Sequence, residues 1–245
     1  MVQKTTLNEN TRFVIFTAKN PKVIKSQKSA SPYFTLILHL APADNSGWEV
    51  CPNSSAGCRA GCLYTSGRGA CDNVKTARIR RTIMFRESNM EFRSMVLADL
   101  YKLDRLCGEN GMIGAVRLNG TSDIDWTEEW SELFGMFPSI QFYDYTKDPL
   151  RMGVMLPPNY HLTFSRSEDN DDDVDRIMSD GFGNVAVVFD KELPEHYNGY
   201  PVVSGENDDE RFLDPAGCIV GLIAKGKARR DCSGFVVKVE SAVLV

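Results

Sequence analysis

Four of the chain's seven cysteines lie close together, at Cys51, Cys58, Cys62 and Cys71. The spaces between them hold six, three and eight residues, several of which are glycine. Thiolates bind metals, and glycine lets the backbone bend tightly around a bound metal. Cysteines at this density are rarely needed for packing alone, so this segment predicts a metal or iron–sulfur site.

The cysteine spacing favours an iron–sulfur cluster, with zinc as the alternative. Zinc sites usually use two cysteine pairs, each separated by about two to four residues, and here only Cys58 and Cys62 form such a pair. A 4Fe-4S cluster is larger than one ion and accepts wider spacing. Cys51, Cys58 and Cys62 are the first three candidate ligands, and Cys71 is the nearest fourth. Cys232 is a second candidate for that place, and a redox or core role without metal is the third interpretation.

The composition is that of a globular, slightly acidic protein. The 245 residues carry a net charge of −5 and are 42% hydrophobic and 25% charged, which are ordinary values. The acidic balance argues against a protein coated for nucleic acid, although a local basic face is compatible with it. We see no signal peptide and no apolar run long enough to span a membrane. We therefore expect a cytoplasmic protein with no membrane partner, in which clustered cysteines bind metal rather than form disulfides.

A basic stretch follows the cysteines. Eight Lys or Arg and only three acidic residues occupy 59–93, and its helical part, 75–93, is expected to contact phosphates of nucleic acid or of a nucleotide. A glycine-rich turn precedes this helix, where backbone N–H groups bind anions. The alternative is a solvated helix face whose acidic partners lie elsewhere. The candidate cofactor-binding residues are Gly67, Arg68, Gly69 and Arg78.

The hydrophobic patterns predict alternating strands and helices. Apolar or β-rich runs predict strands at 12–18, 33–40, 112–119, 139–144, 160–165 and 184–190, with shorter strands near 202–203, 218–223 and 235–239. Helical spacing predicts helices from residue 73 and over 90–106, 125–137 and 172–180. This order is typical of an α/β protein with a mostly parallel sheet, here a partial or distorted (β/α) barrel with a cysteine-rich loop after an early strand. We expect one domain over 1–245, made of N-terminal strands (1–40), the cluster loop (41–72) and the helices and strand–helix units that follow (73–245).

Polar side chains follow three of the predicted central strands. Parallel α/β folds bind ligands at the carboxyl ends of their strands. Helix caps and polar loops explain any one such cluster, but three in succession predict a shared pocket. We expect the following residues to bind or protonate a small-molecule or nucleotide substrate: Asp123, Asp144, Lys147, Arg166 and Glu168. The acidic runs 168–175 and 205–214 are expected to be solvated loops.

Most of the chain beyond about residue 30 resembles the bacteriophage "gene product eighty-eight" family. The stretches that carry the resemblance, in order, are CPNSSAGCRAGCLYTSGRG, VKTARIRRT, RLNGTSDIDW, FPSIQFYDYTKD, NYHLTFSRSEDN, NVAVVF and GLIAKGKARRDCSGFV. The resemblance implies a viral protein that works in the cytoplasm of a bacterial host, and it implies no particular activity. It also implies that Cys51, Cys58 and Cys62 are the shared trio, whereas the place of Cys71 is less regular, which is compatible with an open iron site.

A weaker, fold-level likeness is to radical S-adenosylmethionine enzymes. In those enzymes a three-cysteine loop follows the first strand of a (β/α) barrel, and the fourth iron binds the cofactor. Their usual spacing, C-x3-C-x2-C, differs from the C-x6-C-x3-C of this chain, so S-adenosylmethionine as a cofactor rests on analogy. Three function classes follow. They are a cluster-dependent enzyme of radical or redox type, a metal-stapled module that binds nucleic acid or a host protein through 75–93, and an electron-transfer protein.

Overall fold

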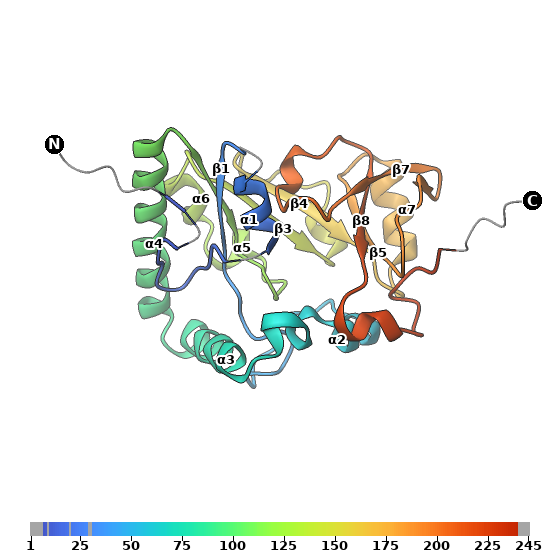
Figure 1. Cartoon of the computed structure of the whole chain (residues 1–245), viewed down its shortest axis with the longest axis horizontal. Helices are drawn as coiled ribbons and strands as arrows, with labels where there is room; N and C mark the ends of the chain where they lie inside the picture. The colour runs from blue at the N-terminus through green and yellow to red at the C-terminus, as the bar shows by residue number, and fades with distance from the viewer. Residues whose placement is uncertain (1–6, 9, 20, 29–30, 240–245) are drawn as a thin grey trace, which may run out of the picture.

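An eight-stranded sheet runs through the computed structural model of the chain, which describes residues 7–8, 10–19, 21–28 and 31–239 (Figure 1). In spatial order the strands are β1 (Tyr33–Ile37), β2 (Ile113–Arg117), β3 (Gln141–Thr146), β4 (Tyr160–Ser165), β5 (Val185–Phe189), β8 (Ile219–Ile223), β7 (Tyr200–Ser204) and β6 (His196–Tyr197). All neighbours pair in parallel except β6 and β7. The predicted α/β fold with a mostly parallel sheet is confirmed. The sheet is open rather than closed into a barrel, because β1 and β6 lie at its two edges.

Helices cover the sheet and its carboxyl end. The α-helices of the described residues are α1 (Pro21–Lys28), α2 (Ala56–Gly61), α3 (Asp72–Glu87), α4 (Asn89–Asn110), α5 (Trp126–Glu129), α6 (Glu132–Met136) and α7 (Asp171–Ser179). Short 3-10 helices are η1 (Leu63–Thr65), η2 (Gly67–Ala70), η3 (Pro149–Arg151), η4 (Arg211–Leu213) and η5 (Gly226–Arg230). Among them α4 packs on β2 and α7 packs on β5, while α2, α3 and η5 lie together along the lower side of the view (Figure 1). No helix of the described residues is both long and apolar enough to cross a membrane.

The central strands are apolar because both faces of the sheet are covered. Ala115 and Val116 of β2 are fully buried, as are Val185 and Val187 of β5. The main apolar core includes side chains from the N-terminal segment to β8. The described residues thus share one sheet and one main core.

The N-terminal segment 12–18 does not form the predicted strand. It makes one isolated bridge, between Thr17 and Ile37. The amides of Val14, Ile15 and Phe16 instead donate to the buried carboxylate of Asp99, at 2.8, 2.8 and 3.2 Å. A side chain of α4 therefore binds the backbone groups that a neighbouring strand would otherwise bind. The predicted strand at 235–239 is likewise reduced to one bridge, between Phe189 and Val237.

Two predicted helical segments are each divided in the structure. The basic stretch 75–93 is not one helix, because α3 ends at Glu87 and α4 begins at Asn89. The segment 125–137 forms α5 and α6, and Asp125 is the N-cap of α5, where it accepts a hydrogen bond from the Thr127 N–H at 2.9 Å. The cysteine-rich segment between β1 and α3 contains α2, η1 and η2 rather than a plain loop.

Candidate functional site

A cavity of about 270 Å³ lies at the carboxyl end of the parallel sheet. Residues that follow the central strands line it, together with the cysteine-rich segment. Its lining includes Cys51, Cys58, Cys62, Arg117, Asn119, Asp123, Tyr145, Lys147, Ser165, Glu206, Asp209 and Lys225. The expected shared pocket is therefore present, with the cysteine trio on its wall.

The three cysteines that line the cavity come from α2 and from the turn before it. Cys58 and Cys62 are four residues apart at α2, so their side chains lie on the same side of the helix. The backbone N–H of Cys58 donates to the N-cap hydroxyl of Ser55 at 3.1 Å. Cys51 precedes the helix, and its Sγ accepts the Ala43 N–H at 3.3 Å. Helix capping and the turn before it thus bring three thiols to one cavity.

Burial raises the pKa of the Cys51 thiol to about 12, and the neighbouring acid Asp123 and the other two thiols add to this rise. Burial likewise raises the pKa of Cys62, with Cys58 adding to the rise. Three thiolates this close together repel one another, so they need a cation to ionise together. Among the described residues, no group of three or more His, Cys, Asp or Glu side chains is placed so that it could hold a metal ion.

The other cysteines lie outside this cavity. Cys71 is exposed at the N-cap of α3 and is absent from the lining. Cys107 and Cys218 are buried. Cys232 is exposed and borders a separate groove. The structure therefore groups Cys51, Cys58 and Cys62 without a fourth cysteine.

Asp123 and Lys147 are the two predicted substrate residues that line the cavity. The Asp123 carboxylate accepts the backbone N–H of Lys147 at 2.8 Å and Nη1 of Arg151 at 3.1 Å. Burial nevertheless raises the pKa of Asp123. The Lys147 ammonium donates to Ser165 Oγ at 2.7 Å. The carboxyl group of Asp123 and the ammonium group of Lys147 thus both lie at the cavity, and each is positioned by a hydrogen bond to a neighbouring side chain.

The remaining three predicted substrate residues are not part of the lining. Asp144 is fully buried in β3, where it accepts hydrogen bonds from Asn119 N–H and from the Tyr160 hydroxyl at 3.0 Å. Burial raises the pKa of Asp144 to about 7. Arg166 pairs with Asp171 at 2.8 Å and donates to the Gly234 carbonyl. Asp144 therefore connects β3 to buried neighbouring groups, and Arg166 connects the end of β4 to α7 and to the segment at Gly234.

Glu168, the third of these, holds the helix that carries the cysteines. Its Oε2 accepts the Ser55 hydroxyl at 2.7 Å, and its Oε1 accepts the Gly57 N–H at 2.6 Å. The loop after β4 is thereby tied to the first turn of α2. Glu168 acts on the cavity by positioning Cys58.

Arg78 is a buried cation beside the trio. Its side chain belongs to a residue that is 7% exposed, and Nε and Nη1 have no hydrogen-bond partner among the described residues. The guanidinium lies 5.7 Å from the centre of the Tyr64 ring. Burial lowers the pKa of Arg78, and nearby Cys62 opposes that shift. A buried cation without a full set of partners is unfavourable, so negative charge at Cys62 would be stabilised here.

The glycine-rich turn does not reach the cavity. Gly67 and Arg68 are exposed, and none of Gly67, Arg68 and Gly69 belongs to the lining. Gly69 is buried, and a Cβ there would lie 2.7 Å from the Leu63 carbonyl oxygen. The glycine at 69 thus allows η2 to pack against η1.

The basic residues of α3 and α4 do not form one exposed face. Arg78 is buried, and half-buried Arg81 donates to the His39 carbonyl at 3.3 Å. Arg93 lies 4.8 Å from the Trp130 ring. Several of the positive charges expected to contact phosphates are therefore used within the fold.

Sequence reasoning missed the charged groups on the other side of the cavity. Arg117 lies 3.5 Å from Asp209, which also accepts the Tyr143 hydroxyl at 2.8 Å. Lys225 lies 2.6 Å from Glu206. The run 205–214 was expected to be a solvated loop, and that is wrong for its centre, since Asp209 is 3% exposed. Acidic residues in succession gave no signal that one of them would pair with a strand-end arginine.

Fold and site together define an open, mostly parallel α/β protein with a cysteine-lined cavity at the carboxyl ends of its strands. The chain belongs to the phage family described as "Gene product 88", whose sequence profile matches residues 14–238. No curated protein and no solved structure matches the chain. The expected family is confirmed, whereas the likeness to radical S-adenosylmethionine enzymes receives no support from these comparisons.

Proposed function

We propose that this phage protein is an iron–sulfur protein in which Cys51, Cys58 and Cys62 hold a 4Fe-4S cluster. The observation that carries the proposal is that these three thiols, and no other cysteine of the described residues, line one cavity at the strand ends. Three cysteine ligands leave one iron without a thiolate. That iron would face the cavity, where a small molecule can bind beside it.

The charges around the trio support a bound cluster. Arg78 offers a buried positive charge near Cys62, with two nitrogen groups that lack hydrogen-bond acceptors among the described residues. The Lys147 ammonium also favours the ionised form of Cys62. Ionised thiolates are the form that binds iron. A bound cluster would supply one-electron chemistry and an iron position open to a ligand.

The residues opposite the thiols give the site the means to bind and protonate a substrate. Lys147 presents an ammonium held by Ser165. The raised pKa of Asp123 makes its carboxyl easier to protonate than an exposed aspartate. The cavity volume of about 270 Å³ is just below the roughly 300–1,000 Å³ that is usual for small-molecule sites. We infer a cluster-dependent reaction of radical or redox type on a small molecule, carried out in the bacterial host's cytoplasm, where thiols stay reduced.

The test is anaerobic purification and reconstitution with iron and sulfide, followed by absorption spectra and by iron, sulfide and zinc analysis. We expect a brown protein with iron and sulfide in equal amounts. Cys51→Ser, Cys58→Ser and Cys62→Ser should each lose most of the iron. The matched controls are Cys71→Ser and Cys232→Ser, which remove exposed thiols and should retain it.

Each alternative has its own outcome in this test. A colourless protein with stoichiometric zinc would overturn the proposal. Iron loss in Cys71→Ser would show four cysteine ligands and exclude an open iron. Added S-adenosylmethionine should change the electron paramagnetic resonance spectrum of the reduced protein if it is the cavity ligand. Arg78 is buried and Arg81 donates to the His39 carbonyl. These contacts give no support to the alternative in which 75–93 binds nucleic acid.

A further inference from the structure

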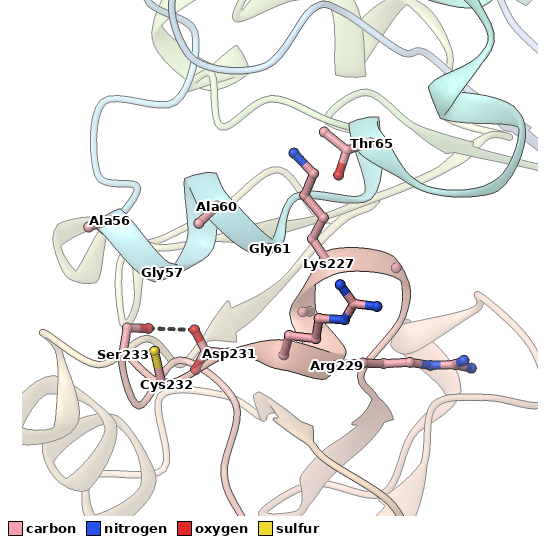
Figure 2. Close-up of a pocket in the computed structure, with 13 residues that line it drawn as sticks. Ala56, Gly57, Ala60, Gly61, Thr65, Lys227, Arg229, Asp231, Cys232 and Ser233 are labelled. Carbon is pink, nitrogen blue, oxygen red and sulfur yellow. Dashed lines mark hydrogen bonds between the residues drawn. The ribbon is translucent and has the colours of Figure 1, made fainter.

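An open groove of about 900 Å³ lies between α2 and η5 (Figure 2). Ala56, Gly57 and Ala60 of α2 form one side, and the segment around η5 forms the other. These positions lie on a different face of α2 from Cys58 and Cys62, because successive helical residues turn by about 100°. The groove and the cysteine-lined cavity therefore lie on two sides of the same short helix.

The groove carries positive charge that no ion pair within the described part of the chain neutralises. Lys227, Arg229 and Arg230 are exposed, and none of them forms an ion pair with a described residue. Figure 2 shows Lys227 extending from η5 across the groove towards Thr65. Three cations on one five-residue helix stand out in a protein whose net charge is −5.

The acidic side chain that lines the groove, Asp231, already accepts hydrogen bonds from its own turn. Asp231 accepts the Ser233 hydroxyl at 2.7 Å, as Figure 2 shows, and also the N–H groups of Gly234 and Val236 at 3.2 and 3.1 Å. It therefore shapes the turn after η5 rather than pairing with the neighbouring cations. The positive charge remains available to a partner.

The wall between groove and cavity is one residue layer thick. Gly61 and Ala228 line both hollows. A Cβ on Gly61 would lie 3.1 Å from the Ala228 Cβ, so the two backbones are in close contact. Cys58 packs against the small apolar cluster that contains Ala228 and Phe235. A partner in the groove would thus approach the cysteine site across a single packed layer.

We propose that this groove docks an acidic one-electron carrier protein that reduces the cluster. The inference rests on the proposed function. A cluster held by Cys51, Cys58 and Cys62 would accept one electron from the reduced flavin of the carrier, so the carrier would be oxidised by one electron and the cluster reduced by one, without bond formation. Electron tunnelling slows steeply with distance, which favours transfer through the thinnest wall. The lining contains no aromatic side chain, whereas sites for single-stranded nucleic acid commonly stack bases on aromatic rings.

The test measures binding of a purified acidic bacterial flavodoxin to the full-length protein by calorimetry at low salt. Lys227→Glu with Arg230→Glu reverses two groove charges and should weaken binding by at least about 10-fold, with the difference vanishing at high salt. The matched control is Arg12→Glu with Arg80→Glu, which changes net charge equally at two exposed residues outside the groove. The control should stay within about 2-fold of the wild type, because steering acts through the local field.

Three results would overturn the docking proposal. They are absence of flavodoxin binding by the wild type, an equal loss in the two variants, and tighter groove-dependent binding of a single-stranded oligonucleotide than of flavodoxin. In the iron-loaded protein, the second-order rate of reduction by reduced flavodoxin should fall in parallel with binding. A protein that takes up no iron would refute the proposed function and, with it, the electron transfer. The calorimetric measurement needs no cluster and would still decide whether the groove docks the carrier.

Discussion

Replacing Glu168 with alanine should detach the first turn of α2 from the sheet. Both carboxylate oxygens of Glu168 are used, one by the Ser55 hydroxyl at 2.7 Å and the other by the Gly57 N–H at 2.6 Å. Ser55 in turn caps the helix by accepting the Cys58 N–H. The substitution would leave two buried polar groups without their acceptor, at the helix that carries the cysteines.

The size of the effect follows from the two hydrogen bonds. A hydrogen bond to a charged group contributes about 1.5–3 kcal/mol. The two bonds share one carboxylate, and a six-residue helix can open locally before the whole protein unfolds. We therefore expect the free energy of unfolding to fall by about 2–4 kcal/mol rather than by the full sum. Iron retention should fall as well, because Cys58 would lose its fixed position.

Urea unfolding of the metal-free protein and hydrogen exchange of the α2 amides measure these effects. Glu168→Gln keeps one acceptor oxygen and should lie between the wild type and Glu168→Ala. Asp169→Ala is the matched control, since Asp169 is exposed beside it, and should change stability by less than about 0.5 kcal/mol. Equal unfolding free energies and equal α2 exchange in Glu168→Ala and Asp169→Ala would refute the positioning role.

Three further predictions test the packing and electrostatics of the site. Gly57→Ala places a Cβ 2.2 Å from Ser233 Oγ and should lower the unfolding free energy by about 1–3 kcal/mol in urea titration, whereas Gly135→Ala, with open space around it, should not. Arg78→Met removes a buried cation, so the metal-free variant should be at least as stable as the metal-free wild type. After reconstitution with iron and sulfide, the variant should contain less iron than the wild type. A destabilised metal-free variant would contradict this reasoning. Burial raises the pKa of Asp144 from 3.8 to about 7, so the folded state binds a proton that the unfolded state has lost, and stability should fall as pH rises across that window. Asp144→Asn should flatten this pH dependence when urea midpoints are compared at the two ends of the window, and an unchanged slope would show that another group causes it.

The expected fold was predictable where the local signal was strong. The predicted strand 160–165 became β4 with the same bounds, because Tyr160, Leu162 and Phe164 recur at every second position, which is the period of a strand. The segment 12–18 had a similar β-rich pattern and failed. Its backbone groups bind Asp99, which lies more than 80 residues away in the chain. Local pattern cannot reveal such a distant competitor for hydrogen bonds.

The site was predictable to the level of residue type and segment, not of side-chain direction. Adjacent residues of a strand point to opposite faces. Asp144 is therefore buried in β3 while its neighbour Tyr145 lines the cavity. The two residues are adjacent in the sequence, and the sequence pattern of this strand does not show which of them faces the cavity. Glu168 was predicted to act on substrate, and its two hydrogen bonds instead tie down α2.

The sequence alone determined that Cys51, Cys58 and Cys62 are the chain's candidate trio, because thiol chemistry and short spacing are local properties. It also determined that polar groups follow successive strands. Only the tertiary structure decided that the trio and two of those polar groups, Asp123 and Lys147, share one cavity while Cys71 lies outside it. That outcome depends on the register of parallel strands and on the rotation of α2. Both are set by packing between segments far apart in the chain, which no local pattern encodes.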